Sequence, residues 1–297
     1  MQGTLIQEGT LVPDRGLGRP RAGKKITNPR PNLLDSFISL IVRRRVPGRA
    51  RILRFLKQHH PYHLVQARSK HGLLFDLNPE DYLDTIVLKN GYYEEEVLTA
   101  LLQQLGNDGV LWDIGANIGL HAITLKHLCP TAQVVCFEPS PFTFSRLYLN
   151  ANLNQSDLIL INVGLGDSIG YPELSLKING NSGLTSFKPW SNVSYQDAML
   201  CHCDTAANMV RRGIAPIPTV IKIDVESFEF EVLSGFEDLI ENRILRAVIF
   251  ESPSDFLENS SRYPVYHLLQ QAGFAITALP PLDKEVQSIP TNFLALR

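Results

Sequence analysis

From residue 94 onward, two kinds of segment take turns along the chain. Short uninterrupted apolar runs are followed by segments whose apolar residues recur at helical spacing. Short Val, Ile and Leu runs are typical of strands that are buried on both faces, and the segments between them have the pattern of amphipathic helices. The strands are predicted at 109–115, 132–139, 158–167, 219–226 and 246–251, and the helices at 94–105, 119–128, 140–154, 229–242 and 265–274. This alternation predicts an α/β fold with a Rossmann-like, doubly wound, mostly parallel sheet.

Further strand pairs are expected outside this alternation. Each consists of two β-prone runs, and the first two pairs turn at residues that favour tight turns. They are residues 63–78 with a turn at His71 and Gly72, residues 171–187 with a turn at Asn179–Asn181, and the closing strands 275–280 and 291–297.

The first 70 residues differ in charge from the rest of the chain. They carry 15 Lys and Arg against 3 acids, whereas the remaining residues carry 13 against 27. Residues 1–31 are rich in Gly, Pro and basic residues and lack periodicity, which predicts a disordered arm. A basic arm can bind nucleic acid or an anionic membrane, but the short run 43–45 has no aromatic neighbours. This favours an arm that folds onto its own acidic body or onto a partner subunit.

We therefore expect three parts: the arm 1–31, an extension over 32–84 that packs on the core, and the main domain over 85–297. The extension contains predicted helices at 32–45 and 47–58. The 4 cysteines are too few for a disulfide framework. No secretory signal or membrane-spanning run is recognised, so the expected location is the cytoplasm.

The stretch "VLWDIGANIGLHAIT" (110–124) raises the question of what approaches its glycine turn. A phosphate-binding P-loop needs a Lys and a Ser or Thr after the second glycine, and these are absent. A dinucleotide site has a glycine at the position of Asn117, so an NAD-linked oxidoreductase is disfavoured. Asp113 beside such a turn suits a cofactor that is cationic and has no pyrophosphate, and S-adenosylmethionine meets both conditions. A tight turn without any ligand is the structural alternative.

Two groups of acids follow later strands. Glu138 ends the strand next along the chain, where a carboxylate can accept hydrogen bonds from ribose hydroxyls. Asp224 and Glu226 end the strand 219–226, with Lys222 on the same face by period-two spacing, and Glu251 ends the strand after it. These residues are candidates for catalysis, with Asp224 or Glu226 as the base. The alternatives are an ion network of Lys222, Asp224 and Glu251, or a Mg²⁺ site formed by the acids, which we rate below direct base catalysis.

Other signals are weaker. Cys201-His202-Cys203 has ligand-type residues, but the spacing suits zinc poorly and no second pair exists, so no metal is assigned. His121 is interpreted as a packed or solvated residue. Trp190 and Tyr195 are candidates for stacking on a sugar, with ordinary packing equally compatible.

Several motifs together resemble the FkbM-type methyltransferases, which use S-adenosylmethionine. The matching stretches are GYYEEEVL (91–98), DIGANIG (113–119), FEP (137–139), LNANLN (149–154), VGLGD (163–167), IKIDVE (221–226), VLSGF (232–236) and FE (250–251). They cover roughly residues 85–255 in the family's order. The chain departs from the family pattern at Ser227, where glycine is common, and at Cys203, which stands in place of leucine before Asp204.

The resemblance implies a seven-stranded methyltransferase sheet whose last strand is antiparallel, and O-methylation of a hydroxyl on a sugar, a glycan or a polyketide-type product. No nucleic acid partner is expected, and a homo-oligomer through the N-terminal region is possible. A non-catalytic binding module on the same scaffold is the remaining alternative. The candidate catalytic residues are Asp224, Glu226, Lys222 and Glu251. The candidate cofactor-binding residues are Asp113, Gly115, Ala116, Asn117, Gly119, Glu138, Pro139, Gly164, Leu165 and Asp167.

Overall fold

The computed structural model describes residues 35, 38, 40, 64–177, 180–279 and 291–297 of the 297-residue chain. Asp35, Ile38 and Leu40 are helical. The predicted arm over 1–31, and the rest of the predicted helices at 32–45 and 47–58, lie outside the described residues. The division of the chain into three parts therefore stays a prediction.

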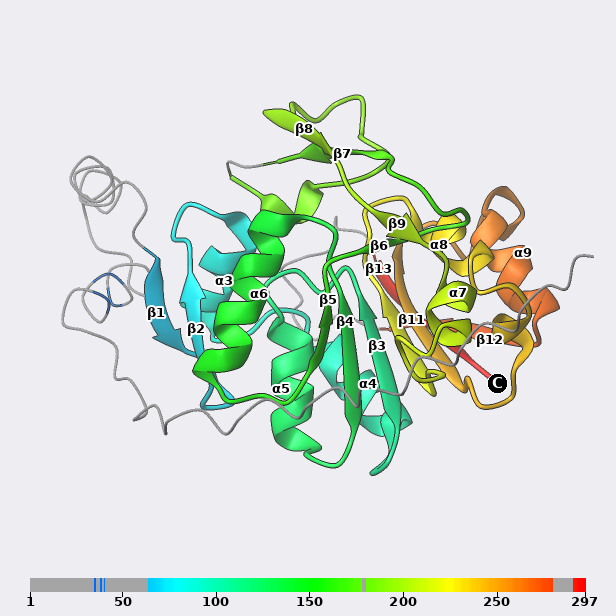
Figure 1. Ribbon diagram of the computed structural model, residues 1–297, viewed down its shortest axis with the longest axis horizontal. Helices are drawn as coiled ribbons and strands as arrows, with labels where there is room; N and C mark the ends of the chain where they lie inside the picture. Colours follow the sequence, from blue (N-terminus) through cyan, green and yellow to red (C-terminus); the bar gives the residue numbers. More distant parts are fainter. Residues whose placement is uncertain (1–34, 36–37, 39, 41–63, 178–179, 280–290) are drawn as a thin grey trace, which may run out of the picture. The chain divides into compact units, whose positions relative to one another are not determined.

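A seven-stranded sheet forms the centre of the main domain (Figure 1). Across the sheet the strands follow the order β12 (Ala275–Ala278), β13 (Thr291–Leu296), β11 (Ala247–Ser252), β10 (Val220–Ile223), β3 (Val110–Ile114), β4 (Gln133–Phe137) and β5 (Ile159–Ile161). Neighbouring pairs from β11 through β5 are parallel, whereas β13 is antiparallel to both of its neighbours. The predicted fold class, with its antiparallel last strand, is confirmed.

Helices cover both faces of this sheet, as the apolar strands require (Figure 1). Successive residues of each strand enter different cores: Leu111 of β3 packs in one cluster and Trp112 in the other. The first cluster includes side chains of α4 (Glu95–Leu105), α5 (Leu120–Leu128) and α6 (Pro141–Leu153). The second includes side chains of α7 (Ala206–Arg211), α8 (Glu229–Ser234) and α9 (Pro264–Gln271).

The helix predicted at 229–242 is interrupted. It consists of α8 and a 3-10 helix, η2 (Glu237–Glu241), with Gly235 between them. A Cβ on Gly235 would lie 1.9 Å from the carbonyl oxygen of Gly166, so the break coincides with a close approach of two backbones. In contrast α6 begins as predicted, with Ser140 as N-cap and Pro141 in the first turn.

The strand predicted at 158–167 is also broken, into β5 and the short β6 (Gly164–Leu165), which pairs with β9 (Cys203–Asp204). Asn162 lies at the break, and its side-chain amide donates hydrogen bonds to the carbonyls of Glu138 at 2.7 Å and Pro139 at 3.1 Å. The chain therefore leaves the sheet at Asn162, and the side chain of this residue holds the loop that follows β4.

The predicted hairpin over 171–187 is present only as a single bridge between Ser175 and Ser186. The partner of β7 (Glu173–Leu176) is instead β8 (Asp197–Leu200), and a 3-10 helix, η1 (Ser182–Leu184), lies between them. Asp81, which caps α3 (Tyr82–Asn90), accepts a hydrogen bond of 2.6 Å from the backbone amide of Ser182. This long-range contact holds the segment against α3. Local turn propensity cannot predict such a contact, because the two residues are far apart in the sequence.

The small N-terminal sheet agrees with the prediction. β1 (Val65–Arg68) and β2 (Leu74–Leu77) are antiparallel, and Gly72 in the turn has a φ of 84°. The helix that follows, α3, spans residues 82–90, so the predicted limit between residues 84 and 85 falls inside it. A 3-10 helix, η3 (Ser260–Arg262), precedes α9.

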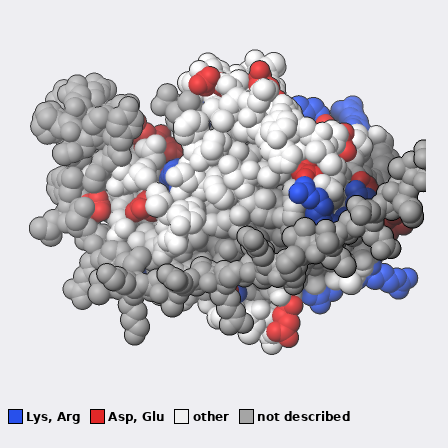
Figure 2. Space-filling model, viewed as in Figure 1, with Lys and Arg blue, Asp and Glu red and all other residues white. Residues whose placement is uncertain are grey.

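Among the described residues drawn in Figure 2, charged side chains lie mainly toward the margins of the face, and its centre is largely uncharged. The exposed residues of α6 and β5 include Phe142, Tyr148 and Ile159.

The acids predicted at the strand ends, such as Asp113 and Glu138, are buried. None of the described helices is both long and apolar enough to cross a membrane.

Candidate functional site

The carboxyl ends of β4, β3, β10 and β11 surround one cavity of about 270 Å³. In open α/β sheets this is the edge where ligands bind. Gly115, Glu138, Asp224 and Glu251 line the cavity, and so does the segment 181–187 with η1. The structure thus brings the two predicted groups of acids to a single space.

A buried ion network lies beneath the cavity. Lys222 and Asp113 are register partners on β10 and β3, so their side chains meet: Nζ lies 3.3 Å from Oδ1. The same ammonium lies 3.1 Å from Oδ2 of Asp224. Burial alone would lower the pKa of Lys222, but the charges of Asp113 and Asp224 raise it above its ordinary value. Lys222 is therefore a cation shared by two acids, and no direct contact joins it to Glu251 within the described residues.

The glycine turn after β3 is a junction of three loops. The backbone amides of Gly115 and Ala116 donate to the carbonyl of Phe137 at 2.9 and 3.0 Å. A Cβ on Gly115 would lie 1.9 Å from the carbonyl oxygen of Asp224. What approaches Gly115 most closely is thus the chain's own backbone after β10, which connects the turn to the candidate catalytic acids.

Glu138 is buried at the end of β4, and each of its carboxylate oxygens accepts a backbone hydrogen bond. Oε2 accepts from Asn117 at 3.0 Å and Oε1 from Ser140 at 3.0 Å. Burial raises the pKa of Glu138 to about 7, and these two hydrogen bonds oppose the shift. Each oxygen keeps a lone pair that can accept a further hydrogen bond. This is the pair of acceptors that a ligand with two donating hydroxyl groups requires.

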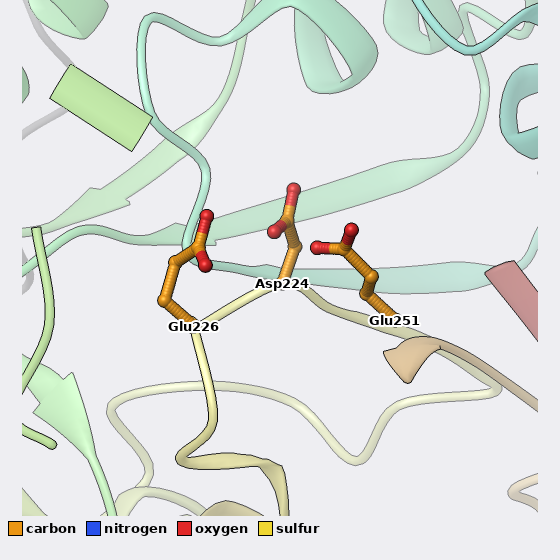
Figure 3. A group of neighbouring side chains, drawn as sticks. All are labelled: Asp224, Glu226 and Glu251. Carbon is orange, nitrogen blue, oxygen red and sulfur yellow. The ribbon is translucent and has the colours of Figure 1, made fainter. Parts of the chain in front are cut away.

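Three carboxyl groups face a common space at the ends of β10 and β11 (Figure 3). One oxygen from each of Asp224, Glu226 and Glu251 lies within 4.8 Å of the others. Burial and the neighbouring carboxylates raise the pKa of Glu226 to about 8 and that of Glu251 to about 10. Both therefore hold a proton at neutral pH, while Asp224 is paired with Lys222.

The backbone after Asp224 adopts the left-handed conformation at two successive residues. Glu226 has a φ of 53° and Ser227 a φ of 73°, although neither is glycine. The carbonyl of Glu226 accepts a hydrogen bond of 2.7 Å from the hydroxyl of Ser186, which fixes the turn. Ser227 thus has the backbone conformation that glycine adopts readily.

The remaining candidates for cofactor binding fall into three groups. Asn117, Pro139, Gly164 and Leu165 line the cavity. Ala116 and Gly119 are buried beside it, and a Cβ on Gly119 would lie 2.4 Å from the side chain of Leu147. Asp167 is exposed and does not line the cavity. It accepts a hydrogen bond of 3.0 Å from the hydroxyl of Ser168.

Sequence reasoning missed several cavity residues. Glu94 and Tyr93 line the cavity from the turn before α4, and Phe187 lines it from the segment after η1. A Cβ on Gly164 would lie 2.5 Å from the ring of Phe187, so the two residues pack directly. Glu94 lies within the motif GYYEEEVL (91–98), and this motif is the sequence signal that points to it.

The weaker candidates separate as well. Trp190 lines the cavity, whereas Tyr195 does not; its hydroxyl accepts a hydrogen bond of 3.0 Å from the backbone amide of Trp190. Cys201 and Cys203 are buried with free thiols. His202, between them, lies 3.8 Å from Asp204.

The chain matches one family model and is similar to several known methyltransferases. The family model described as the methyltransferase FkbM domain matches residues 113–274. The hexuronic acid methyltransferase AglP of Haloferax volcanii is 35% identical over 150 residues, which are 50% of this chain and 59% of that protein. The 31-O-demethyl-FK506 methyltransferase FkbM of Streptomyces tacrolimicus is 30% identical over 196 residues, covering 57% of this chain and 74% of that protein. A solved structure of a putative transferase, PH0793 of Pyrococcus horikoshii, has a TM-score of 0.45 at 13% identity and covers 84% of this chain and 83% of that one.

Proposed function

The chain belongs to the FkbM methyltransferase family, and from this premise we propose that it transfers a methyl group from S-adenosylmethionine to a hydroxyl group of a sugar, a glycan or another natural product. One observation carries the proposal: a single cavity contains both the Glu138 carboxylate and the acids after β10 and β11. The aligned part spans about three fifths of the hexuronic acid methyltransferase, so activity and substrate remain proposals.

The residues at the end of β4 fit the adenosine portion of this cofactor. The backbone amides of Asn117 and Ser140 hold the Glu138 carboxylate in place. Each carboxylate oxygen keeps one lone pair that is free to accept a further hydrogen bond. Ribose offers two neighbouring hydroxyl groups to such an acceptor. Pro139, Gly164 and Leu165 would form the adjoining walls. These residues, together with Gly115 and Asn117, would hold the nucleoside.

The acids at the other end of the cavity fit the acceptor side of a methyl transfer. S-adenosylmethionine supplies a methyl group that is activated by its sulfonium. The protein must align a hydroxyl group and take up its proton. Glu226 is the best-matched base in its deprotonated form, because a pKa of about 8 lies close to the pH at which most enzymes operate. Its carboxyl group is mostly protonated at pH 7, and the carboxylate that takes up the proton of the acceptor becomes the main form above about pH 8. Its carboxyl group is within 4.8 Å of Asp224 and Glu251 at the nearest oxygens.

The other members of the cluster have supporting roles in this proposal. Glu251, with a pKa of about 10, keeps its proton and can donate a hydrogen bond to the acceptor. Lys222 holds Asp224 in place from below. Trp190 provides an aromatic wall at the cavity for a sugar ring or another bulky acceptor.

A methyl-transfer screen tests the proposal. The protein is incubated with S-adenosylmethionine carrying an isotopically labelled methyl group and with three classes of acceptor: uronic acids, neutral sugars and glycans, and polyketide hydroxyls. We expect labelled methyl ether from at least one class, and less of it from Glu226→Gln. S-adenosylhomocysteine should bind in calorimetry with no comparable binding of NAD. Cofactor binding without transfer to any class would favour the non-catalytic module, and tight NAD binding would contradict the cofactor assignment.

A further inference from the structure

Glu94 is a cavity carboxylate that the proposed chemistry does not yet use. It precedes α4 and has a φ of 53°, which is uncommon for a residue with a side chain. Its Oε1 accepts a hydrogen bond of 2.9 Å from the side-chain amide of Asn292 on β13. Its Oε2 lies 3.5 Å from Nε2 of His121 on α5. Two other elements, β13 and α5, thus hold this carboxylate at the cavity.

A buried pair of side chains supports it from behind. The hydroxyl of Tyr92 lies 3.0 Å from Nδ1 of His121, and both residues are buried. Burial raises the pKa of Tyr92 well above its ordinary value, so the phenol keeps its proton and can donate it to Nδ1. The N–H of His121 then lies on Nε2, toward Glu94. The pair therefore favours an acceptor, an ionised carboxylate, at residue 94.

Glu94 also differs in charge state from the neighbouring acids. Burial works to raise its pKa, but His121, Asn292 and the charge of Lys222 together lower it below the ordinary value. Glu226 and Glu251 instead hold protons at neutral pH. Asp113 and Asp224 already share the ammonium of Lys222. Among the described cavity acids, Glu94 is thus best suited to meet a cationic ligand group.

Glu94 and Glu138 line the same cavity from different elements. Glu138 ends β4, and Lys222, whose charge acts on Glu94, is on β10, two strands away across β3. Two strand spacings, about 10 Å, thus separate the strand of Glu138 from the strand of the cation that acts on Glu94. S-adenosylmethionine carries its ammonium group at the end of the methionine portion, away from the ribose. A nucleoside bound at Glu138 would direct that portion across the glycine turn toward β10.

We propose that Glu94, positioned by His121 and Asn292, binds the ammonium group of the methionine portion of S-adenosylmethionine. The inference rests on the proposed function, because it assumes that this cofactor is the ligand. It assigns the two ends of the cofactor to two carboxylates: Glu138 takes the ribose and Glu94 takes the ammonium. Asp113, the residue that the sequence suggested for the cationic group, serves instead as the partner of Lys222.

Calorimetric titration of two ligands into three proteins tests this assignment without any acceptor. S-adenosylhomocysteine carries the ammonium group, whereas 5′-methylthioadenosine has the nucleoside and the sulfur but no amino acid portion. Glu94→Gln should weaken S-adenosylhomocysteine by about ten- to hundredfold and change 5′-methylthioadenosine by less than about twofold. Glu95→Gln is the matched control: Glu95 pairs with Lys70 and His71, does not line the cavity, and its replacement should leave both affinities unchanged.

Each other outcome has a distinct meaning. An equal loss for both ligands would assign Glu94 a purely structural role, and no loss for either would remove it from the cofactor site; both results overturn the inference. If the wild-type protein binds neither ligand, the proposed function itself fails. Thermal melting without ligand verifies that each variant is folded. Should Glu94→Gln not fold, Asn292→Ala releases Oε1 of the same carboxylate, and a severalfold loss confined to S-adenosylhomocysteine is expected.

Discussion

The backbone amide of Asn117 lies 3.0 Å from Oε2 of Glu138 and donates a hydrogen bond to it. The residue in the middle of the glycine turn therefore binds the carboxylate at the end of the neighbouring strand. In a dinucleotide site this position is a glycine that lets the pyrophosphate approach. Here the backbone amide of Asn117 donates its hydrogen bond to Glu138. The glycine turn and the Glu138 carboxylate are therefore connected directly.

Replacement of Glu138 should weaken cofactor binding. Glu138→Ala removes the acceptor for the ribose and also the partner of the Asn117 and Ser140 amides. Charge-assisted hydrogen bonds contribute about 1.5–3 kcal/mol, so the affinity for S-adenosylhomocysteine should fall about ten- to hundredfold. Calorimetry measures this affinity, with the exposed Glu173→Ala at the start of β7 as the control. Unchanged affinity in a folded Glu138→Ala protein would show that this carboxylate does not bind the ligand.

Replacement of Glu226 should affect turnover rather than cofactor binding. If Glu226 takes up the proton of the acceptor, Glu226→Gln should lower kcat by about 10²–10⁴. The affinity for S-adenosylhomocysteine should change little, because other residues hold the cofactor. Steady-state kinetics with an acceptor from the screen measures the change, with the exposed Glu258→Gln as the matched control. Full turnover in Glu226→Gln would exclude Glu226 as the base.

The pairing of Lys222 with Asp113 predicts that loss of one partner destabilises the protein and that loss of both partners destabilises it less. Lys222→Met leaves the carboxylate of Asp113, which is 1% exposed, without its cation. Removal of one partner of a buried pair costs about 3–5 kcal/mol, whereas replacement of both by apolar residues is often close to neutral. Urea unfolding should therefore show a large loss for Lys222→Met and a partial recovery when Asp113→Leu is added. A double variant no more stable than the single one would argue against a paired role.

The protonated acids predict that stability falls as the pH rises. The pKa of Glu226 is about 8 and that of Glu251 about 10, both above the ordinary value of 4.5. Between the ordinary pKa of 4.5 and these raised pKa values, the folded protein binds more protons than the unfolded chain. Unfolding therefore becomes more favourable as the pH increases. The Tm of the ligand-free protein should decrease from about pH 5 to about pH 10, the pKa of Glu251. Glu251→Gln should flatten this decrease, and an identical slope in both proteins would contradict the raised pKa of Glu251.

The left-handed backbone at Ser227 predicts a stabilising substitution. The left-handed conformation costs about 1–2 kcal/mol for a residue with a Cβ, whereas glycine loses about 0.5–1 kcal/mol of unfolded-state freedom. Ser227→Gly should therefore be more stable by up to about 1 kcal/mol in urea unfolding. Ser234→Gly, in the last turn of α8, is the opposite control and should destabilise the protein by about 0.5–1 kcal/mol.

Sequence alone determined the elements whose cause is local. Continuously apolar runs between helical segments identified the parallel strands. The acids at their ends, such as Glu138 and Asp224, were expected at one edge because parallel strands end together. The closing strands 275–280 and 291–297 were also identified. The misread elements, at Gly235, at Asn162 and at residues 171–187, are those where a distant part of the chain intervenes.

Only the tertiary structure decided which charges neutralise one another. The pairing of Lys222 with Asp113 follows from the register of two strands, and that register depends on how the whole sheet packs. Glu94 meets Asn292 across 198 positions of sequence, and His121 reaches it from a third element. Hydrophobic periodicity and turn chemistry act over a few residues, whereas a carboxylate's protonation depends on burial and on every charge near it in space. For that reason the sequence could name acids at the site, but only the folded chain distinguishes the ionised Glu94 from the protonated Glu226 and Glu251.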